Sequence, residues 1–409
     1  MIDVGTQNLK TTSLSPTYDV VPGESVGLFQ LGDNLWHVLE LLRTHKTEYP
    51  KVEVSWDEES PHKSAVTIHL PYITLYFPPS PIYQLLSLIQ ITVPPSSSSN
   101  LELTYETQVL SSSHIPLTRA RVGRLMGPTF VSKAGNKLEF PGITFQLTPS
   151  NMGDAGFGPR EDIVHKLIIE ATEDEELQPR LISCVIEPNT GITLGLDEDH
   201  LLRITIGQTT AQDLILDIGS PLRKFWKEDD RLSKMWGNTN TNQQSSCFWN
   251  YLQYGLDFLV DKDGIVIKII CHSNIPGTPL FQRYAKCPWT ITTSSGQLDS
   301  TTPSNVFRSH FSSSQNVEEY IEQLKLTVPS PSPTPDNEIN GNSVNRKKNK
   351  KRNGSPNNAM ILDRLVEGGL DGVSGLGASK LIGFNGLIIE EDEKSGGICS
   401  VLIFKDNNN

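Results

Sequence analysis

The sequence predicts an α+β protein, rich in β-structure overall, made of divergent tandem repeats of one helix packed on an antiparallel β-sheet. Short amphipathic segments begin near residues 35, 119, 211 and 317, which is roughly 90 residues apart, as in a repeat architecture. Between them lie runs of aromatic and β-branched residues, which strands favour. Chance similarity among short α+β units is the alternative to a true repeat.

The repeat is clearest in Thr205–Gly277, which begins with a predicted helix. Thr209 or Thr210 can cap the helix. The carboxylate of Asp213 in the first turn interacts favourably with the positive end of the helix dipole. The apolar face at three- and four-residue spacing consists of Leu214, Ile215 and Ile218. Gly219 and then Pro221 predict the end of the helix, because a proline cannot continue it.

Strands follow this helix in the same unit. The aromatic and β-branched runs Phe248–Tyr251 and Leu256–Val260 predict two of them. Asp263–Gly264 is a hairpin-turn signal, because glycine tolerates a positive φ there, and the isoleucine-rich run from Ile265 to Ile270 predicts a largely buried strand. The unit is therefore expected to be one helix laid on an antiparallel sheet.

The other units show the same order more loosely. We expect helices over Leu31–Leu42, capped by Asp33 or Asn34, after Thr118, and over Val317–Leu326. The remaining predicted strands are Val52–Trp56, Val66–Leu70, Ile73–Phe77, Leu86–Val93, Leu138–Phe140, Ile143–Leu147, Val164–Glu170, Leu181–Glu187, Ile192–Leu196, Cys287–Thr293, Gly383–Ile389 and Ile398–Phe404.

These elements divide the chain into a flexible N-terminus and four repeats. Residues 1–24 are polar, although Tyr18–Val21 could add a short strand. The repeats are expected at 25–110, 111–200, 201–295 and 310–405, and the third is the clearest. A Ser/Pro-rich and basic insertion at 327–358 interrupts the fourth, because such a composition buries too little apolar area to fold.

Composition excludes several function classes. The net charge of −12 and a sequence pI of about 5.3 argue against non-specific nucleic-acid binding, which requires basic surface. No apolar run approaches the length of roughly 20 residues that a membrane helix needs. The N-terminus lacks the pattern of a signal peptide. The five cysteines are scattered and never in CxxC spacing, which indicates free thiols in a reducing compartment.

No motif predicts catalysis, a cofactor or a metal. Asp261–Gly264 opens like a calcium loop, but its glycine comes too early for an EF-hand, so a hairpin turn is favoured. The glycine-rich Gly368–Lys380 lacks a phosphate-binding pattern. Cys271 and His272 are adjacent, so on a strand they point to opposite faces, which favours a structural cysteine and a surface histidine over a catalytic pair.

Aromatic residues between 225 and 251 exceed what a helix-on-sheet core easily hides, so most are expected in the core and the rest at a partner surface. The partner-contact candidates are Trp226, Trp236 and Trp249, together with the turn residues Asn274, Pro276 and Gly277. A rigid structural turn is the equal alternative for the last three, because Asn, Pro and Gly serve either purpose.

One basic cluster lies in the insertion, and its members are Arg346, Lys347, Lys348, Lys350, Lys351 and Arg352. They are candidates for contact with anionic lipid or for a nuclear signal. A solvated basic spacer is the favoured alternative, because such charge runs are usually disordered.

Several motifs resemble the phagosome assembly factor 1 family. They are GSPLRKFWKEDDRL, FWNYLQYGLDFLVD, HSNIPG and FQRYAKC in the third unit, and LFQLGDNLWHVLELL in the first. The resemblance covers roughly residues 24–92 and 200–290 and elsewhere follows the order of elements. This chain departs from the family in the insertion at 327–358 and in its glycine-rich C-terminal part.

The resemblance implies a non-enzymatic cytoplasmic adaptor in autophagy, without a cofactor. It implies a WD40-propeller partner of the breast-carcinoma-amplified-sequence type, recruited with the chain to the forming autophagosome, and through it a contact with phosphoinositide membranes. The alternative is a peripheral trafficking factor, in transport from the Golgi to the plasma membrane, that binds anionic lipid directly. A third hypothesis is a small-molecule or enzymatic pocket between the sheets.

Overall fold

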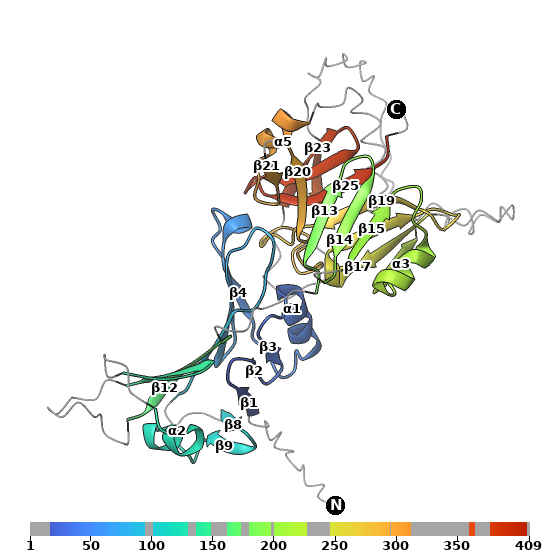
Figure 1. The fold of residues 1–409 in the computed structure, drawn as a ribbon. Coiled ribbons are helices and arrows are strands. Elements are labelled where there is room, and N and C mark those ends of the chain that lie inside the picture. Colours follow the sequence, from blue (N-terminus) through green and yellow to red (C-terminus); the bar gives the residue numbers. More distant parts are fainter. Residues whose placement is uncertain are drawn as a thin grey trace, which may run out of the picture. The chain divides into compact units, whose positions relative to one another are not determined.

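The computed structural model describes residues 17–94, 101–129, 136–148, 162–172, 180–197, 200–226, 246–294, 296–311, 360–364 and 377–406. Four mostly antiparallel sheets and a few short helices confirm the β-rich α+β class (Figure 1). The chain forms two compact units. Unit 1 comprises residues 1–56, 65–78 and 84–179, and unit 2 comprises residues 57–64, 79–83 and 180–409.

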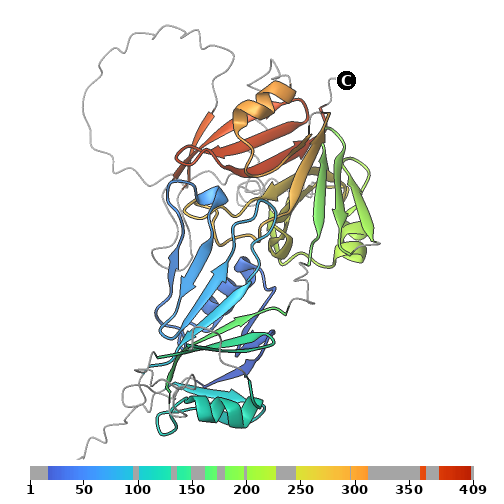
Figure 2. The same ribbon diagram turned by 60° about the vertical axis from the view of Figure 1, so that its left-hand side comes forward.

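Unit 1 contains a five-stranded and a seven-stranded sheet (Figure 2). The strand order of the smaller sheet is β3-β2-β1-β8-β9, and that of the larger is β10-β11-β12-β7-β6-β5-β4. The bounds of the smaller sheet are β1 Thr17–Val21, β2 Ser25–Val26, β3 Phe29–Gln30, β8 Glu102–Tyr105 and β9 Gln108–Ser111. Those of the larger are β4 Glu53–Ser55, β5 Val66–His69, β6 Ile73–Phe77, β7 Leu88–Thr92, β10 Lys137–Phe140, β11 Ile143–Leu147 and β12 Val164–Glu170.

The described residues of unit 1 include the helices α1 (Leu35–Thr44) and α2 (Arg119–Met126). Asn34 caps α1 and Thr118 caps α2, each by accepting a backbone N–H three residues later. The apolar stripe of α1 is buried, as its spacing predicts: Leu35, Val38, Leu39 and Leu42. A short 3-10 turn, Pro61–Lys63, lies in the part of unit 2 that comes from residues 57–64.

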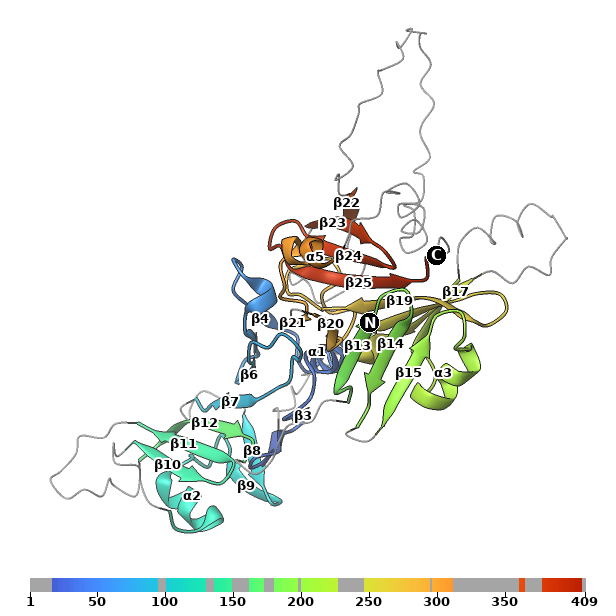
Figure 3. The ribbon, with the colours of Figure 1, turned by 45° about the horizontal axis from the view of Figure 1, so that its top comes forward.

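Unit 2 contains a five-stranded sheet, β15-β14-β13-β20-β21, and an eight-stranded sheet, β16-β17-β18-β19-β25-β24-β23-β22 (Figure 3). The smaller sheet consists of β13 Ser183–Glu187, β14 Gly191–Gly195, β15 Leu201–Thr205, β20 Trp289–Thr293 and β21 Gly296–Leu298. The larger consists of β16 Arg223–Trp226, β17 Cys247–Tyr251, β18 Leu256–Val260, β19 Val266–His272, β22 Met360–Arg364, β23 Gly377–Phe384, β24 Leu387–Asp392 and β25 Ile398–Phe404.

The main core of unit 2 lies between its two sheets. Helix α3 (Ala211–Ile218) contributes Leu214 and Ile218 to this core, and α5 (Ser304–His310) contributes Phe307. Thr210 and Asp213 form a capping box at the start of α3, which is the cap that the sequence predicts. The Trp289 and Phe307 rings pack at 6.5 Å between centroids, so β20 and α5 share this core.

The two units have the same topology. In each, a three-strand meander precedes a helix and a four-strand meander, then two strands, a second helix and the remaining strands of the larger sheet follow. The first strand of each smaller sheet pairs in parallel with the fourth, β1 with β8 and β13 with β20. The expected division into four repeats remains a prediction, although the order of elements returns at about that period.

A tight contact between two turns recurs in both units. In unit 1 the Gly23 N–H donates to the Gly142 carbonyl, and a Cβ on Gly142 would meet the Gly23 backbone at 2.3 Å. In unit 2 a Cβ on Gly386 would meet Asn189 at 2.4 Å. Both glycines have positive φ, so each turn needs glycine for its conformation and for this close approach.

Some elements differ from the expectation. Residues 1–24 were expected to be flexible, with a possible short strand over Tyr18–Val21. That strand forms as Thr17–Val21 at the centre of a sheet, where Tyr18 and Val20 are buried. The strand expected over Gly383–Ile389 is instead two strands, because the chain turns at Asn385–Gly386. The helix predicted over 317–326 and the insertion at 327–358 lie outside the described residues.

Candidate functional site

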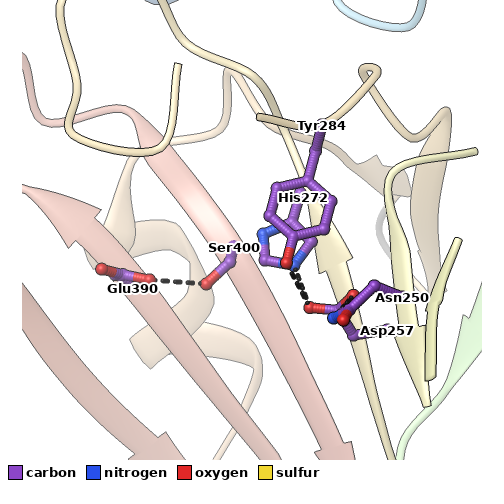
Figure 4. A network of polar contacts seen from close by, with 6 residues as sticks. All are labelled: Asn250, Asp257, His272, Tyr284, Glu390 and Ser400. Carbon is purple, nitrogen blue, oxygen red and sulfur yellow. Dashed lines mark hydrogen bonds and ion pairs between the residues drawn. The ribbon is translucent and has the colours of Figure 1, made fainter. Parts of the chain in front are cut away.

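The larger sheet of unit 2 has a second face, opposite the main core, and a row of buried polar residues crosses it (Figure 4). Register pairs Asn250 with Asp257 and His272 with Ser400, and Ser400 in turn pairs with Glu390. We call the following set the polar row: Asn250, Asp257, His272, Ser400, Glu390 and Ser379. Each member is at most 8 % exposed, so each polar group needs a partner within the protein.

Asp257 is the centre of the polar row. Its Oδ1 accepts a hydrogen bond of 2.7 Å from Asn250 Nδ2. Its Oδ2 lies 2.9 Å from His272 Nε2 and accepts the Tyr284 hydroxyl at 2.8 Å. Because an ionised carboxylate can only accept, Nε2 is assigned as the nitrogen that carries the histidine proton. Nδ1 of His272 is then an acceptor, and it is buried without a hydrogen-bond partner among the described residues.

Tyr284 covers His272. The two rings lie face to face in the close-up (Figure 4). Their centroids are 3.7 Å apart and their planes are inclined by 13°. Tyr284 comes from the segment after β19, where Asn274 and Gln282 have positive φ and Asn274 Oδ1 accepts the Gln282 N–H. This bond closes a buried loop, so the aromatic lid over His272 is fixed by the local backbone.

Glu390 is the second buried carboxylate of the polar row. Its two oxygens accept hydrogen bonds of 2.7 Å from the hydroxyls of Ser379 and Ser400. Since Ser400 donates its only hydroxyl proton to Glu390, it is not aligned as a nucleophile that His272 activates. The hydrogen bond between Asp257 and His272 therefore resembles that of a catalytic pair. The arrangement as a whole instead joins neighbouring strands of the sheet through side-chain hydrogen bonds.

Three cysteines meet in the core on the other face of the same sheet. Cys184 lies on β13, Cys271 on β19, and Cys287 just before β20, and all three are fully buried. Their sulfur atoms all lie within 4.8 Å of one another, and those of Cys184 and Cys271 are 4.0 Å apart. Cys271 and His272 point to opposite faces, as predicted from their adjacency.

Lys286 precedes Cys287 and supplies a half-buried amine in unit 2. Its Nζ donates a hydrogen bond of 2.9 Å to the Ser80 carbonyl, although part of the residue remains accessible to solvent. Burial lowers the pKa of Lys286 to about 8, and the nearby Asp299 carboxylate only partly opposes this shift.

Comparison of the sequence with known proteins places the chain in a family. The sequence model described as Phagosome assembly factor 1 matches residues 25–186 and 197–404. The chain belongs to the Phagosome assembly factor 1 family. No solved structure matches the chain significantly.

Relatives of the same family name occur in distant organisms. The chain is 23 % identical over 321 residues to a PHAF1 protein of Arabidopsis thaliana, covering 70 % of this chain and 77 % of that protein. It is also 23 % identical over 342 residues to a PHAF1 protein of Caenorhabditis elegans, covering 70 % and 79 %. A PHAF1 protein of Drosophila melanogaster is 32 % identical over 82 residues, or 19 % of each chain.

The structure places the predicted contact residues of this family member in different surroundings. Trp226 is 55 % exposed on β16, whereas Trp249 is 8 % exposed and packs in the main core. Asn274 and Pro276 are buried, and Gly277 is partly exposed, which favours the rigid turn that the sequence left open. Trp236 lies outside the described residues, as do Arg346, Lys347, Lys348, Lys350, Lys351 and Arg352.

Sequence reasoning missed the polar row and the thiol cluster. His272 was expected at the surface, but it is buried, because Asp257 and Tyr284 together supply the partners that burial requires. The scattered cysteine spacing gave no sign that Cys184 would meet Cys271. On β18 every residue is buried, so its sequence pattern gave no signal for a second buried face.

Proposed function

We propose that the chain is a non-enzymatic adaptor in autophagosome assembly, recruited to the forming autophagosome together with a WD40-propeller protein of the breast-carcinoma-amplified-sequence type. The match of most of the chain to the Phagosome assembly factor 1 family carries this proposal. The name of that family describes an assembly role. Through its partner the adaptor would meet phosphoinositide membranes. Among the described residues, no helix is both long and apolar enough to cross a membrane.

The chemistry of the polar row favours a binding protein over an enzyme. Asp257 accepts from three groups and Glu390 from two, so these carboxylates are already committed to neighbours. A general acid or base must instead reach the substrate proton that it transfers. We therefore assign the polar row to the stability of unit 2.

An exposed apolar surface supports a contact with a protein partner. Large apolar side chains are exposed on the last turn of α3, just before the edge strand β16, and at the end of that strand. We call this set the α3–β16 patch: Ile215, Leu216, Leu222 and Trp226. Leu216 is 74 % exposed. Tryptophan and other large side chains dominate the binding energy of interfaces, and such a group of exposed apolar residues marks contact sites. The proposed occupant is the propeller partner.

Co-purification tests this surface. The variant Leu216→Ser with Trp226→Ser, expressed in the cells of origin, should recover at least tenfold less propeller protein than the wild type, since a hot-spot residue contributes about 2 kcal/mol or more. Ile163→Ser in unit 1 is the matched control, because Ile163 is 52 % exposed and lies away from the patch in sequence. Equal recovery with both variants would exclude the α3–β16 patch as the contact.

Direct binding to anionic lipid, with a role in Golgi-to-surface transport, is the alternative from the sequence. It depends on the basic cluster Arg346–Arg352, which lies outside the described residues. Replacing these basic residues with serine should reduce flotation with anionic liposomes if the alternative holds, because each basic residue near such a surface contributes about 1 kcal/mol. Unchanged flotation would remove it.

A further inference from the structure

Three buried thiols in unit 2 form a cluster whose geometry suits a metal ion. Cys184, Cys271 and Cys287 are at most 1 % exposed, and each comes from a different segment of the chain. Three sulfurs around one ion at a metal–sulfur distance of about 2.3 Å stand about 4.0 Å apart. The sulfurs of Cys184 and Cys271 are already 4.0 Å apart, and all three fall within 4.8 Å of one another.

The fold itself does not require thiols at these places. In the smaller sheets, Cys184 pairs in parallel with Trp289 of β20, and Tyr18 of unit 1 pairs in the same way with Leu103 of β8. Cys184 therefore aligns with Tyr18. The same comparison aligns Cys271 with Ile91 and Cys287 with Leu101. All three unit 1 residues are buried, so ordinary apolar side chains fill this part of the core there.

The convergence of three thiols also favours a soft metal ion, which thiolate ligands select. Among the described residues, these three cysteines are the one group of potential metal ligands that meets in this way.

We propose that Cys184, Cys271 and Cys287 bind one copper(I) ion in a three-coordinate, all-sulfur site. Soft thiolates select copper(I), zinc and iron–sulfur clusters. Structural zinc is almost always four-coordinate and iron–sulfur clusters usually use four cysteines, whereas three sulfurs converge here. One Cu⁺ that displaces one thiol proton to solvent leaves the net charge of the cluster unchanged, so binding adds no buried charge.

Copper loading of the reduced full-length chain tests the site. Because the thiols are buried, the chain is refolded without oxygen in the presence of Cu⁺. A chelator that becomes coloured when it binds Cu⁺ is then added to remove weakly bound copper. The wild type should retain one copper per chain. X-ray absorption at the copper edge should show three sulfur ligands at about 2.3 Å.

Cysteine variants separate this site from other thiols. Cys271→Val, which resembles the apolar residue at the same place in unit 1, should lose the copper while circular dichroism shows a folded chain. Cys247→Ser and Cys399→Ser change the two cysteines outside the cluster and should keep the copper. Failure of the wild type to retain copper would overturn the proposal. Retention by Cys271→Val, or zinc in preference to copper at these cysteines, would also overturn it.

Discussion

The larger sheets of the two units share a topology but differ on their second faces. Register aligns the polar row of unit 2 with polar residues of unit 1, in the order Asn250, Asp257, His272, Ser400 and Glu390 with His69, Thr74, Thr92, Lys166 and Gln146. The unit 1 residues are exposed or half-buried, and those of unit 2 are buried. Where solvent supplies hydrogen bonds, polar residues need no particular partner, whereas burial forces them into a network.

The neighbouring apolar residues show the same contrast. On the second face of unit 2, Phe248, Ile270 and Leu402 belong to a buried cluster. Their counterparts in unit 1 are Thr67, Gln90 and Ile168, which are half-buried. The second face is therefore buried in the unit whose residues there are more apolar, although the two topologies are the same. In unit 1 the strands β6 and β11 still alternate between buried and accessible residues.

Removing the central carboxylate should have the largest effect. Asp257→Asn leaves His272 Nε2–H and the Tyr284 hydroxyl without their charged acceptor, and breaking a buried pair costs about 3–5 kcal/mol. Thr74→Val at the aligned place in unit 1 should cost less than about 1 kcal/mol. Urea unfolding followed by circular dichroism measures both. Similar losses in the two variants would mean that the second faces do not differ energetically.

Replacing the second carboxylate with its unit 1 counterpart should have a smaller effect. Glu390→Gln introduces the residue type of Gln146 and weakens the bonds from Ser379 and Ser400, so we expect a loss of about 2 kcal/mol. The reverse change, Gln146→Glu, should stay within about 0.5 kcal/mol because that side chain is half-buried. If Glu390→Gln leaves the free energy of unfolding unchanged in the same urea assay, the buried charge is not needed for stability.

The half-buried amine of Lys286 should give unit 2 a pH dependence. The Lys286 pKa is lowered by burial from 10.5 to about 8, so the unfolded chain binds more protons between these values. Stability should therefore rise as pH increases from about 8 to about 10.5, with a slope below about 1.4 kcal/mol per pH unit from this group. Lys286→Met should remove that rise, whereas Lys166→Met in unit 1 should keep it. Thermal unfolding across this pH range would decide, and an unchanged rise in Lys286→Met contradicts the assignment.

Helix caps should show the smallest contrast, because the units treat them alike. Asn34 caps α1 and Thr210 caps α3. Each cap residue also forms a β-bridge, Asn34 to Leu85 shortly before β7 and Thr210 to Ile265 directly before β19. Alanine at either cap should cost about 1 kcal/mol. Equal losses in urea unfolding would confine the difference between units to the second faces, and a much larger loss at one cap would not.

Local signals in the sequence predicted local structure well. Thr118 and Thr210 cap helices as expected, and Asp263–Gly264 forms the predicted hairpin turn, with Asp261 Oδ1 accepting two backbone N–H groups. The hairpin of β8 and β9 was missed because Glu106 and Thr107 adopt positive φ without glycine or proline. Helix α5 was missed because it is short and buries only Phe307.

The site depends on contacts that no local pattern encodes. His272 meets Asp257 and Tyr284 across strands and loops, and Cys184 meets Cys271 from another sheet. Alternation of residue types indicates which face of a strand is buried only when one face is open to solvent. On β18 and β25 both faces are buried, so the pattern could not separate the core from the polar row.

A role in autophagosome assembly can be tested by measuring autophagic flux in cells that lack the chain. Deletion should reduce flux, the wild type should restore it, and the variant Leu216→Ser with Trp226→Ser should restore it much less than Ile163→Ser does. Immunoblotting would first establish equal protein levels. Normal flux in the deletion cells would contradict a role in autophagosome assembly, and full restoration by the patch variant would contradict the α3–β16 patch as the surface through which the chain acts.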